Sequence, residues 1–242
     1  MKIWTGTALG CLLVIWAPGQ LPLALRAAGQ SQAVAVVAVG EKVTYSIKQL
    51  GITSGTATLV YQGQAPGEAA DVHLIVFTAD GMNFYDQEKI YFHHQSFLPM
   101  RVERDINIFG KKEKIIEYYE PDQERIRIVK TIGKATEEQI IKKAGPIDNI
   151  YCFIYRYRQN GQFALNEALN LRLPTQDVAM SIVDQPKLKV AGELYDAFYL
   201  QSHPEKYHIW FDGSEKKIPL RIDGAIGFGK TAMIMSKYEN PS

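Results

Sequence analysis

The chain contains few cysteines: Cys11 and Cys152 are the only two in 242 residues. Cys11 lies in the apolar stretch at the start of the chain, and removal of that stretch would leave Cys152 alone. A single thiol excludes the internal disulfide framework on which many small secreted domains depend. Because Cys152 lies between Tyr151 and Phe153, we expect a small buried core side chain rather than a nucleophile.

The chain also lacks an excess of charge of either sign. Lys and Arg total 27 and Asp and Glu total 26, which gives a formal charge of +1. This balance gives no electrostatic support for a nucleic-acid partner. Hydrophobic residues make up 46% and charged residues 22% of the chain, values typical of folded proteins, so long disordered segments and collagen-like repeats are excluded.

No apolar run reaches the roughly 20 residues needed to cross a bilayer as a helix. The longest candidate follows Lys2, spans residues 3–16 and is followed by Pro18-Gly19 and further small residues. This pattern predicts a secretory signal peptide over residues 1–28, with an uncleaved anchor as the alternative. The apolar run continues beyond Cys11, which argues against lipidation there. We therefore expect an exported protein, periplasmic or otherwise extracytoplasmic.

Beyond the leader we expect a flexible segment over residues 29–39 and a single β-rich domain over residues 40–239. Alternation with a period of two begins at Lys42, where Val43, Tyr45 and Ile47 share one face. Many similar short runs follow, separated by turn residues, and the chain lacks βαβ alternation. The predicted fold is mainly β: an antiparallel curled sheet or incomplete β-barrel with one or two short helices.

Two helices are expected in the middle of the chain. The first has a capping box at Thr136–Gln139 and lysines at its end, and Gly145-Pro146 would stop it. We expect it to be short and exposed. The second begins after Asp148, because apolar residues recur from Ile147 to Tyr155 at helical spacing. Its β-branched and aromatic residues leave a strand as the alternative.

One segment matches the P-loop spacing G-x-x-x-x-G-K-[ST] and involves Gly224, Gly229, Lys230 and Thr231. A working P-loop needs a following helix and further strands of a parallel sheet, but only 11 residues remain after Thr231 (242 − 231 = 11). We therefore interpret the segment as a turn between two antiparallel strands. No nucleotide or other cofactor is expected.

No catalytic or metal-ligating residue can be assigned from the sequence. His93 and His94 are adjacent, so on a regular strand they would point to opposite faces and could not bind one metal ion together. We interpret the histidines as polar-face residues. The chain has no Gly-x-Ser-x-Gly motif. The strand-end acids cannot be assembled into a catalytic pair without coordinates: Asp80, Asp86, Asp184, Asp196 and Asp212.

Aromatic residues make up 11% of the chain and fall mostly in strand-like runs. The simplest explanation is a packed core with cross-strand aromatic pairs. The functional alternative is an apolar cavity or groove that holds a lipid, a glycan or a peptide.

The segment Gly40 to Ile47, followed by Leu50 to Leu59, resembles the opening of the domain of unknown function 3108 family of exported bacterial envelope proteins. The segments Pro146 to Tyr157 and Ile209 to Ile222 and the last hairpin, which ends in residues 231–238, are also similar to that family. The resemblance covers residues 40–239. It implies a mostly β protein of the cell envelope with no established activity and no catalytic residues to transfer.

Together these patterns favour a non-enzymatic envelope protein that binds an apolar or amphiphilic ligand, or a protein partner, in the concavity of its sheet. The expected partners are a lipid, a glycan or an envelope protein, and contact with the membrane would be peripheral or through the signal peptide. One alternative is a structural or assembly factor that acts by edge-strand pairing. A further alternative is a hydrolase of envelope polymers.

Overall fold

A computed structural model describes residues 37–226 and 231–241. The expected signal peptide, Cys11, Gly229 and Lys230 lie outside these residues. All of these described residues belong to one compact unit. No helix among the described residues has both the length and the hydrophobicity needed to cross a membrane.

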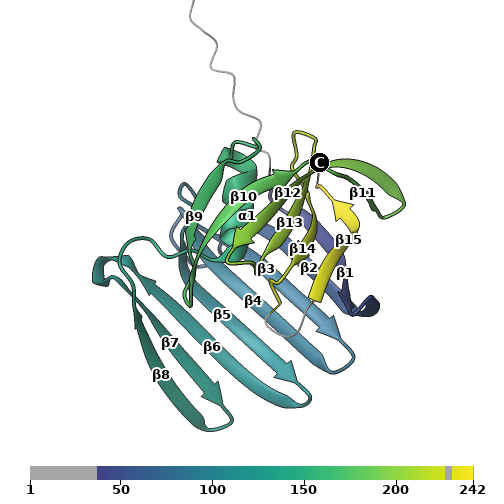
Figure 1. The fold of residues 1–242 in the computed structure, drawn as a ribbon. Helices are drawn as coiled ribbons and strands as arrows, with labels where there is room; N and C mark the ends of the chain where they lie inside the picture. Colours follow the sequence, from purple (N-terminus) through teal and green to yellow (C-terminus); the bar gives the residue numbers. More distant parts are fainter. Residues whose placement is uncertain (1–36, 227–230, 242) are drawn as a thin grey trace, which may run out of the picture. The chain divides into compact units, whose positions relative to one another are not determined.

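The compact unit consists of one antiparallel sheet of 15 strands and one α-helix (Figure 1), so the expected fold class is confirmed. A short 3-10 helix at Pro121–Gln123 lies between β6 and β7. The strands of the first half are β1 (Lys42–Gln49), β2 (Ile52–Gln64), β3 (Val72–Gly81), β4 (Phe84–His93), β5 (Pro99–Ile108), β6 (Lys111–Glu120), β7 (Arg125–Ile132) and β8 (Ala135–Lys142). Those of the second half are β9 (Ala168–Arg172), β10 (Asp177–Asp184), β11 (Lys187–Val190), β12 (Glu193–His203), β13 (His208–Asp212), β14 (Pro219–Asp223) and β15 (Thr231–Glu239).

The strand order is β8-β7-β6-β5-β4-β3-β2-β1-β15-β14-β13-β12-β10-β9, and β11 pairs with β12. Each of β2 to β8 is thus a hairpin neighbour of the strand before it. Strand β1 joins the two halves, because it pairs with β2 on one side and with β15 on the other. The turn between β1 and β2 places Leu50 at φ 50° and Gly51 at φ 82°, which is the geometry of a tight hairpin.

Gly55 is not part of the turn between β1 and β2. It lies within β2 opposite Gly81, and a β-carbon there would come within 2.3 Å of the Asp80 carbonyl oxygen. The close approach of two backbones therefore requires glycine at this position.

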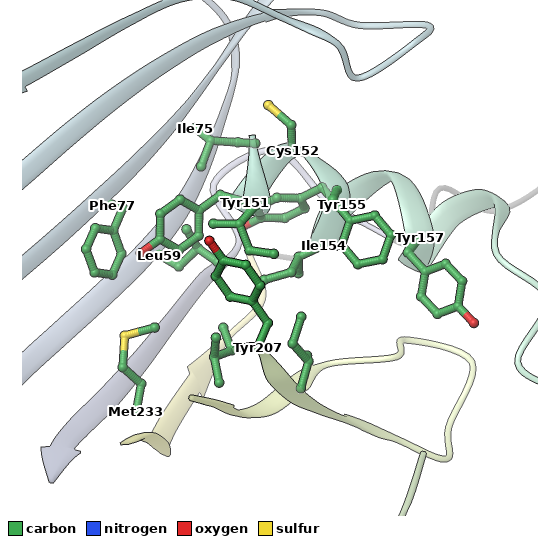
Figure 2. Packing of buried hydrophobic residues seen from close by; sticks show 14 of the residues in the cluster. Leu59, Ile75, Phe77, Tyr151, Cys152, Ile154, Tyr155, Tyr157, Tyr207 and Met233 are labelled. Atoms are coloured by element: carbon green, nitrogen blue, oxygen red, sulfur yellow. The ribbon is translucent and has the colours of Figure 1, made fainter. Parts of the chain in front are cut away.

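The helix α1 (Ile150–Asn160) confirms the second expected helix. The side chain of Asn149 caps it by accepting a hydrogen bond from the Tyr151 N–H at 2.8 Å. Nearly all of its residues are buried, and they share one core with strands from both halves of the sheet (Figure 2). A helix that is buried on all sides fills the space that the sheet encloses.

The first expected helix is wrong. Residues 135–142 form strand β8, which pairs with β7 in a regular register from Ile132 opposite Ala135 to Arg125 opposite Lys142. Gly133, at φ 59°, makes the turn between them. The capping-box letters are present, but the hydrogen bonds available at the edge of β7 outweigh the weak local preference for a helix.

A fully buried ion pair connects the start of the sheet to α1. Arg158 donates hydrogen bonds to both carboxylate oxygens of Glu41, at 2.6 and 2.8 Å, and to the Lys216 carbonyl. Both side chains of the pair have no exposed surface. The hydroxyl of Tyr238 donates a third hydrogen bond to Glu41 at 3.0 Å. The carboxylate that precedes β1 is thereby held by both the helix and the last strand.

Candidate functional site

The most unusual polar group of the structure lies on the inner face of β4, β5 and β6. We define the carboxylate cluster as Asp86 and Glu88 on β4, Arg104 on β5 and Glu117 on β6. Register places these residues on the same face as the core, because Glu88 lies opposite Arg104 and Glu117 lies opposite the buried Val102. Three carboxyl groups thus gather around one guanidinium on a face that is otherwise largely apolar.

Arg104 organises the two carboxylates of β4. Its Nε donates to Asp86 Oδ1 at 2.8 Å, and its second nitrogen, Nη2, donates to Asp86 Oδ2, so this pair is bidentate. The same Nε lies 3.3 Å from Glu88 Oε1. Asp86 is thus fully engaged, whereas Glu88 makes a single, longer contact with the guanidinium.

Burial dominates the protonation of this cluster. It raises the pKa of Glu88 to about 7, with Arg104 opposing the shift and the charges of Asp86 and Glu117 adding to it. Burial also raises the pKa of Glu117, against the opposing hydrogen bond from Tyr119. Burial alone would lower the pKa of Arg104, but the hydrogen bond to Asp86 and the two β4 charges raise it overall. The guanidinium therefore stays charged while Glu88 titrates near neutral pH.

Two tyrosines complete the surroundings of the cluster. The hydroxyl of Tyr119 on β6 donates to Glu117 Oε2 at 2.8 Å. Tyr151, in the first turn of α1, is 1% exposed, and its hydroxyl has no hydrogen-bond partner among the described residues. Its ring stacks at 4.6 Å on Phe77, which lies opposite Glu88 in the register of β3 and β4, so Tyr151 lies next to the cluster. Burial first, and then the charges of Glu88 and Asp86, raise the pKa of Tyr151.

The sheet continues beyond the cluster into β7 and β8, which extend away from α1 (Figure 1). The strand register shows which residues of these strands share the inner face with the cluster: Ile115 is opposite Arg104, and Ile128 is opposite Glu117. We call this surface the isoleucine face. Its members are the partly exposed or exposed inner-face isoleucines of four strands: Ile106, Ile108, Ile115, Ile128, Ile132 and Ile141.

The opposite face of the same strands is held together by polar contacts. Arg125 and Arg127 both contact Glu120, at 2.5 and 3.4 Å, and the Arg127 guanidinium lies 4.1 Å from the centre of the Tyr118 ring. The inner face has fewer polar groups, although Lys130 pairs with Glu113 at 2.7 Å. The two faces of β5–β8 therefore differ in chemistry, and the apolar side chains gather on the inner one.

The structure describes two of the P-loop-like residues, Gly224 and Thr231, and places them next to two antiparallel strands. Gly224 follows β14 at φ 82°, and Thr231 is the first residue of β15, which pairs antiparallel with β14. The strand after Thr231 stands where a P-loop would have a helix. A cavity of about 850 Å³ borders this segment on the outer face and is lined in part by Lys48, Arg221 and Asp223.

The histidines are not simply polar-face residues. His73 is half-buried on the inner face, where its Nδ1 lies 2.5 Å from the Tyr61 hydroxyl oxygen and its ring stacks on His94 at 4.0 Å. Burial lowers the pKa of His73. Within the described residues, no group of His, Cys, Asp or Glu side chains is arranged to hold a metal ion. Cys152 is a buried free thiol, as expected.

Sequence reasoning missed the carboxylate cluster, although one signal was available. Asp86 and Glu88 alternate in phase with Ile90 and Phe92, so they had to share the buried face of β4. Asp86 was expected at a strand end, whereas it lies within β4. Arg104 and Glu117 had no local signal, because their meeting depends on the register of three strands.

Comparisons with known proteins give only distant likenesses. No family model matches the chain, and no curated protein matches it. Among solved structures, a beta-barrel-like protein of Domain of Unknown Function DUF1849 from Brucella abortus is similar over 86% of this chain and 100% of its own, with 12% identity and a TM-score of 0.49. A putative lipoprotein from Parabacteroides distasonis is similar over 84% of this chain and 96% of its own, with 8% identity and a TM-score of 0.27.

Proposed function

We propose that this chain is an exported, non-enzymatic protein of the cell envelope that binds an amphiphilic molecule on the isoleucine face. The observation that supports the proposal is the contrast between the two sides of β5–β8. On the outer side, charged groups pair with one another and the isoleucines are only two, Ile116 and the 46% exposed Ile140, whereas the inner side carries the whole isoleucine face. Covering such surface is favourable at about 25 cal/mol per Å².

The position of the isoleucine face favours an amphiphile over a purely apolar ligand. Ile128 packs against the main core, so the face is continuous with the interior. The carboxylate cluster lies at the inner end of the same face, where Glu117 is opposite Ile128. A ligand that covers the isoleucines therefore reaches a strongly polar group at one end. The space next to α1 is filled by the side chains of the helix, which leaves the open part of the sheet as the binding surface.

Matched pairs of isoleucines test the proposal. Ile115 and Ile141 belong to the inner face, and their sequence neighbours Ile116 and Ile140 point to the outer face. We expect the double substitution Ile115→Asn with Ile141→Asn to weaken binding of a neutral fluorescent amphiphile such as Nile red by about tenfold, because apolar contact is lost. The double substitution Ile116→Asn with Ile140→Asn should change it less than about twofold.

Fluorescence titration of the mature protein measures both variants, and circular dichroism confirms that each is folded. Equal weakening by the inner and outer substitutions would contradict the proposal, as would failure of the wild-type protein to bind the probe.

A second candidate is edge-strand pairing through β8. Among the described residues β8 pairs only with β7, so one side of this eight-residue strand has free backbone groups. Glu137, Glu138 and Lys142 place charges along it, a common protection against unselective pairing. The occupant would be an extended segment of another protein. It would protect the amides of β8 from hydrogen exchange, whereas an amphiphile would cover the inner-face methyl groups.

A further inference from the structure

The carboxylate cluster contains an excess of acceptor groups over donors. The Arg104 guanidinium contacts both oxygens of Asp86 and one oxygen of Glu88. Tyr119 satisfies one oxygen of Glu117. The contacts leave Glu88 Oε2 and Glu117 Oε1 without a hydrogen-bond donor among the described residues. Three carboxylates against one guanidinium leave a formal charge of −2 when all are ionised.

The unpartnered hydroxyl of Tyr151 is the second, independent observation. Buried polar groups almost always have a hydrogen-bond partner, and an isolated one costs about 1–3 kcal/mol. Tyr151 is 1% exposed, and its ring stacks at 4.6 Å on Phe77, the residue opposite Glu88 in the register of β3 and β4. It projects from the first turn of α1 toward the strands (Figure 2). A buried group that offers both a donor and an acceptor next to unfilled carboxylate oxygens indicates a place for a ligand.

The cluster can be reached from the isoleucine face. The side chains of Asp86 and Glu88 are 6% and 11% exposed, whereas that of Arg104 is 26% exposed and Glu117 is half-buried. Exposure thus increases from β4 to β5, in the direction of the open sheet. A group that enters along Ile115 would meet Glu117 and Glu88 before it meets Asp86.

We propose that the carboxylate cluster binds the ammonium group of a cationic amphiphile, whose apolar chain lies along the isoleucine face. This inference rests on the proposed function and adds the charge of the ligand. An ammonium group has three N–H donors, which match the acceptors offered by Glu88, Glu117 and the Tyr151 hydroxyl oxygen. Binding leaves the Arg104–Asp86 pair intact and removes the excess negative charge. An organic cation with an apolar chain would also cover the isoleucine face, which borders the cluster where Ile128 lies opposite Glu117.

Two probes with the same chain separate this inference from the proposed function. Decylammonium carries the cation, and decyl glucoside has the same chain with a neutral head. For the full mature protein at pH 7.5, we expect isothermal titration calorimetry to show at least about tenfold tighter binding of decylammonium, as hydrogen bonds to charged groups predict. The substitutions Glu117→Gln and Tyr151→Phe should each reduce binding of decylammonium by about tenfold and leave binding of decyl glucoside unchanged within about twofold.

The control variant is Glu137→Gln. Glu137 lies on the same inner face, opposite Lys130 and outside the cluster, so its removal tests general attraction of the cation by the surface. We expect this variant to bind both probes as the wild-type protein does. Because the Tyr151→Phe variant removes only a hydroxyl group without a partner, it should fold even if a charge variant does not.

The outcomes distinguish the two claims. The cation site would be overturned if the wild-type protein bound the two probes with equal affinity. It would also be overturned if Glu137→Gln and Glu117→Gln weakened binding of decylammonium equally. In either case, binding of decyl glucoside would still support the proposed function. Absence of binding for both probes would overturn both. Tight binding of decylammonium that depends on Glu117 and Tyr151, with no binding of decyl glucoside, would support the cation site and contradict the role of the isoleucine face.

Discussion

At the scale of single residues, the buried charges of this protein fall into two groups with opposite character. Glu41 and Arg158 form a complete pair in which every charged oxygen has a donor. Asp86, Glu88 and Glu117 form an incomplete group around one guanidinium. A complete pair stabilises one arrangement of the chain, whereas an incomplete group retains affinity for a proton or another cation.

Glu88 should make the stability of the protein depend on pH. Its pKa is raised from 4.5 to about 7 by burial, so the folded state holds this proton more tightly than the unfolded state. The stabilisation is fully present below pH 4.5 and is lost as the pH rises through about 7. The variant Glu88→Gln cannot ionise. Relative to the wild-type protein, its free energy of unfolding should therefore be higher at pH 8 than at pH 4, by on the order of 2 kcal/mol.

Urea unfolding at both pH values measures this difference. The variant Glu137→Gln, which removes an exposed carboxylate from the same face, should show no such trend. A difference between Glu88→Gln and wild type that stays constant with pH would contradict the raised pKa.

At the scale of elements, most strands could be predicted from the sequence, but β8 could not. Val43, Tyr45 and Ile47 alternate inward as expected and are fully buried. The segment 135–142 was expected to be helical and is the edge strand β8. Its residues are almost all exposed, so no buried face imposed a period of two on the sequence. A strand that is held by backbone hydrogen bonds alone does not need alternating hydrophobic and polar side chains, so its sequence does not predict it.

The helix α1 depends on its link to the start of the sheet. We expect Arg158→Met to lower the free energy of unfolding by about 3–5 kcal/mol, because Glu41 would remain buried with its charge uncompensated. The double variant Glu41→Leu with Arg158→Met should recover a large part of that loss, since neither charge remains. Urea denaturation of the three proteins measures both effects. A loss below about 1 kcal/mol for the single variant would contradict the role of this pair.

At the scale of the whole molecule, the sheet has two parts with different surroundings. Near β1 the strands of both halves share one core with α1, and the sheet curls around that helix. Beyond β5 the same sheet continues into β6, β7 and β8, where Ile126 is still buried but the inner-face isoleucines of the isoleucine face are partly exposed or exposed. The curled architecture followed from alternation and the absence of βαβ units. The carboxylate cluster could not be foreseen, because Glu88, Arg104 and Glu117 meet only when the register of β4, β5 and β6 is known.

The central claim is that the inner face of β5–β8 is the binding surface, and methyl NMR of isoleucine-labelled protein tests it most directly. On titration with decylammonium, we expect the methyl signals of Ile115, Ile128 and Ile141 to shift and to show contacts with the alkyl chain, while those of Ile116 and Ile140 stay unchanged. Shifts on the outer-face isoleucines equal to those on the inner face, or no shifts at saturating ligand, would contradict the account.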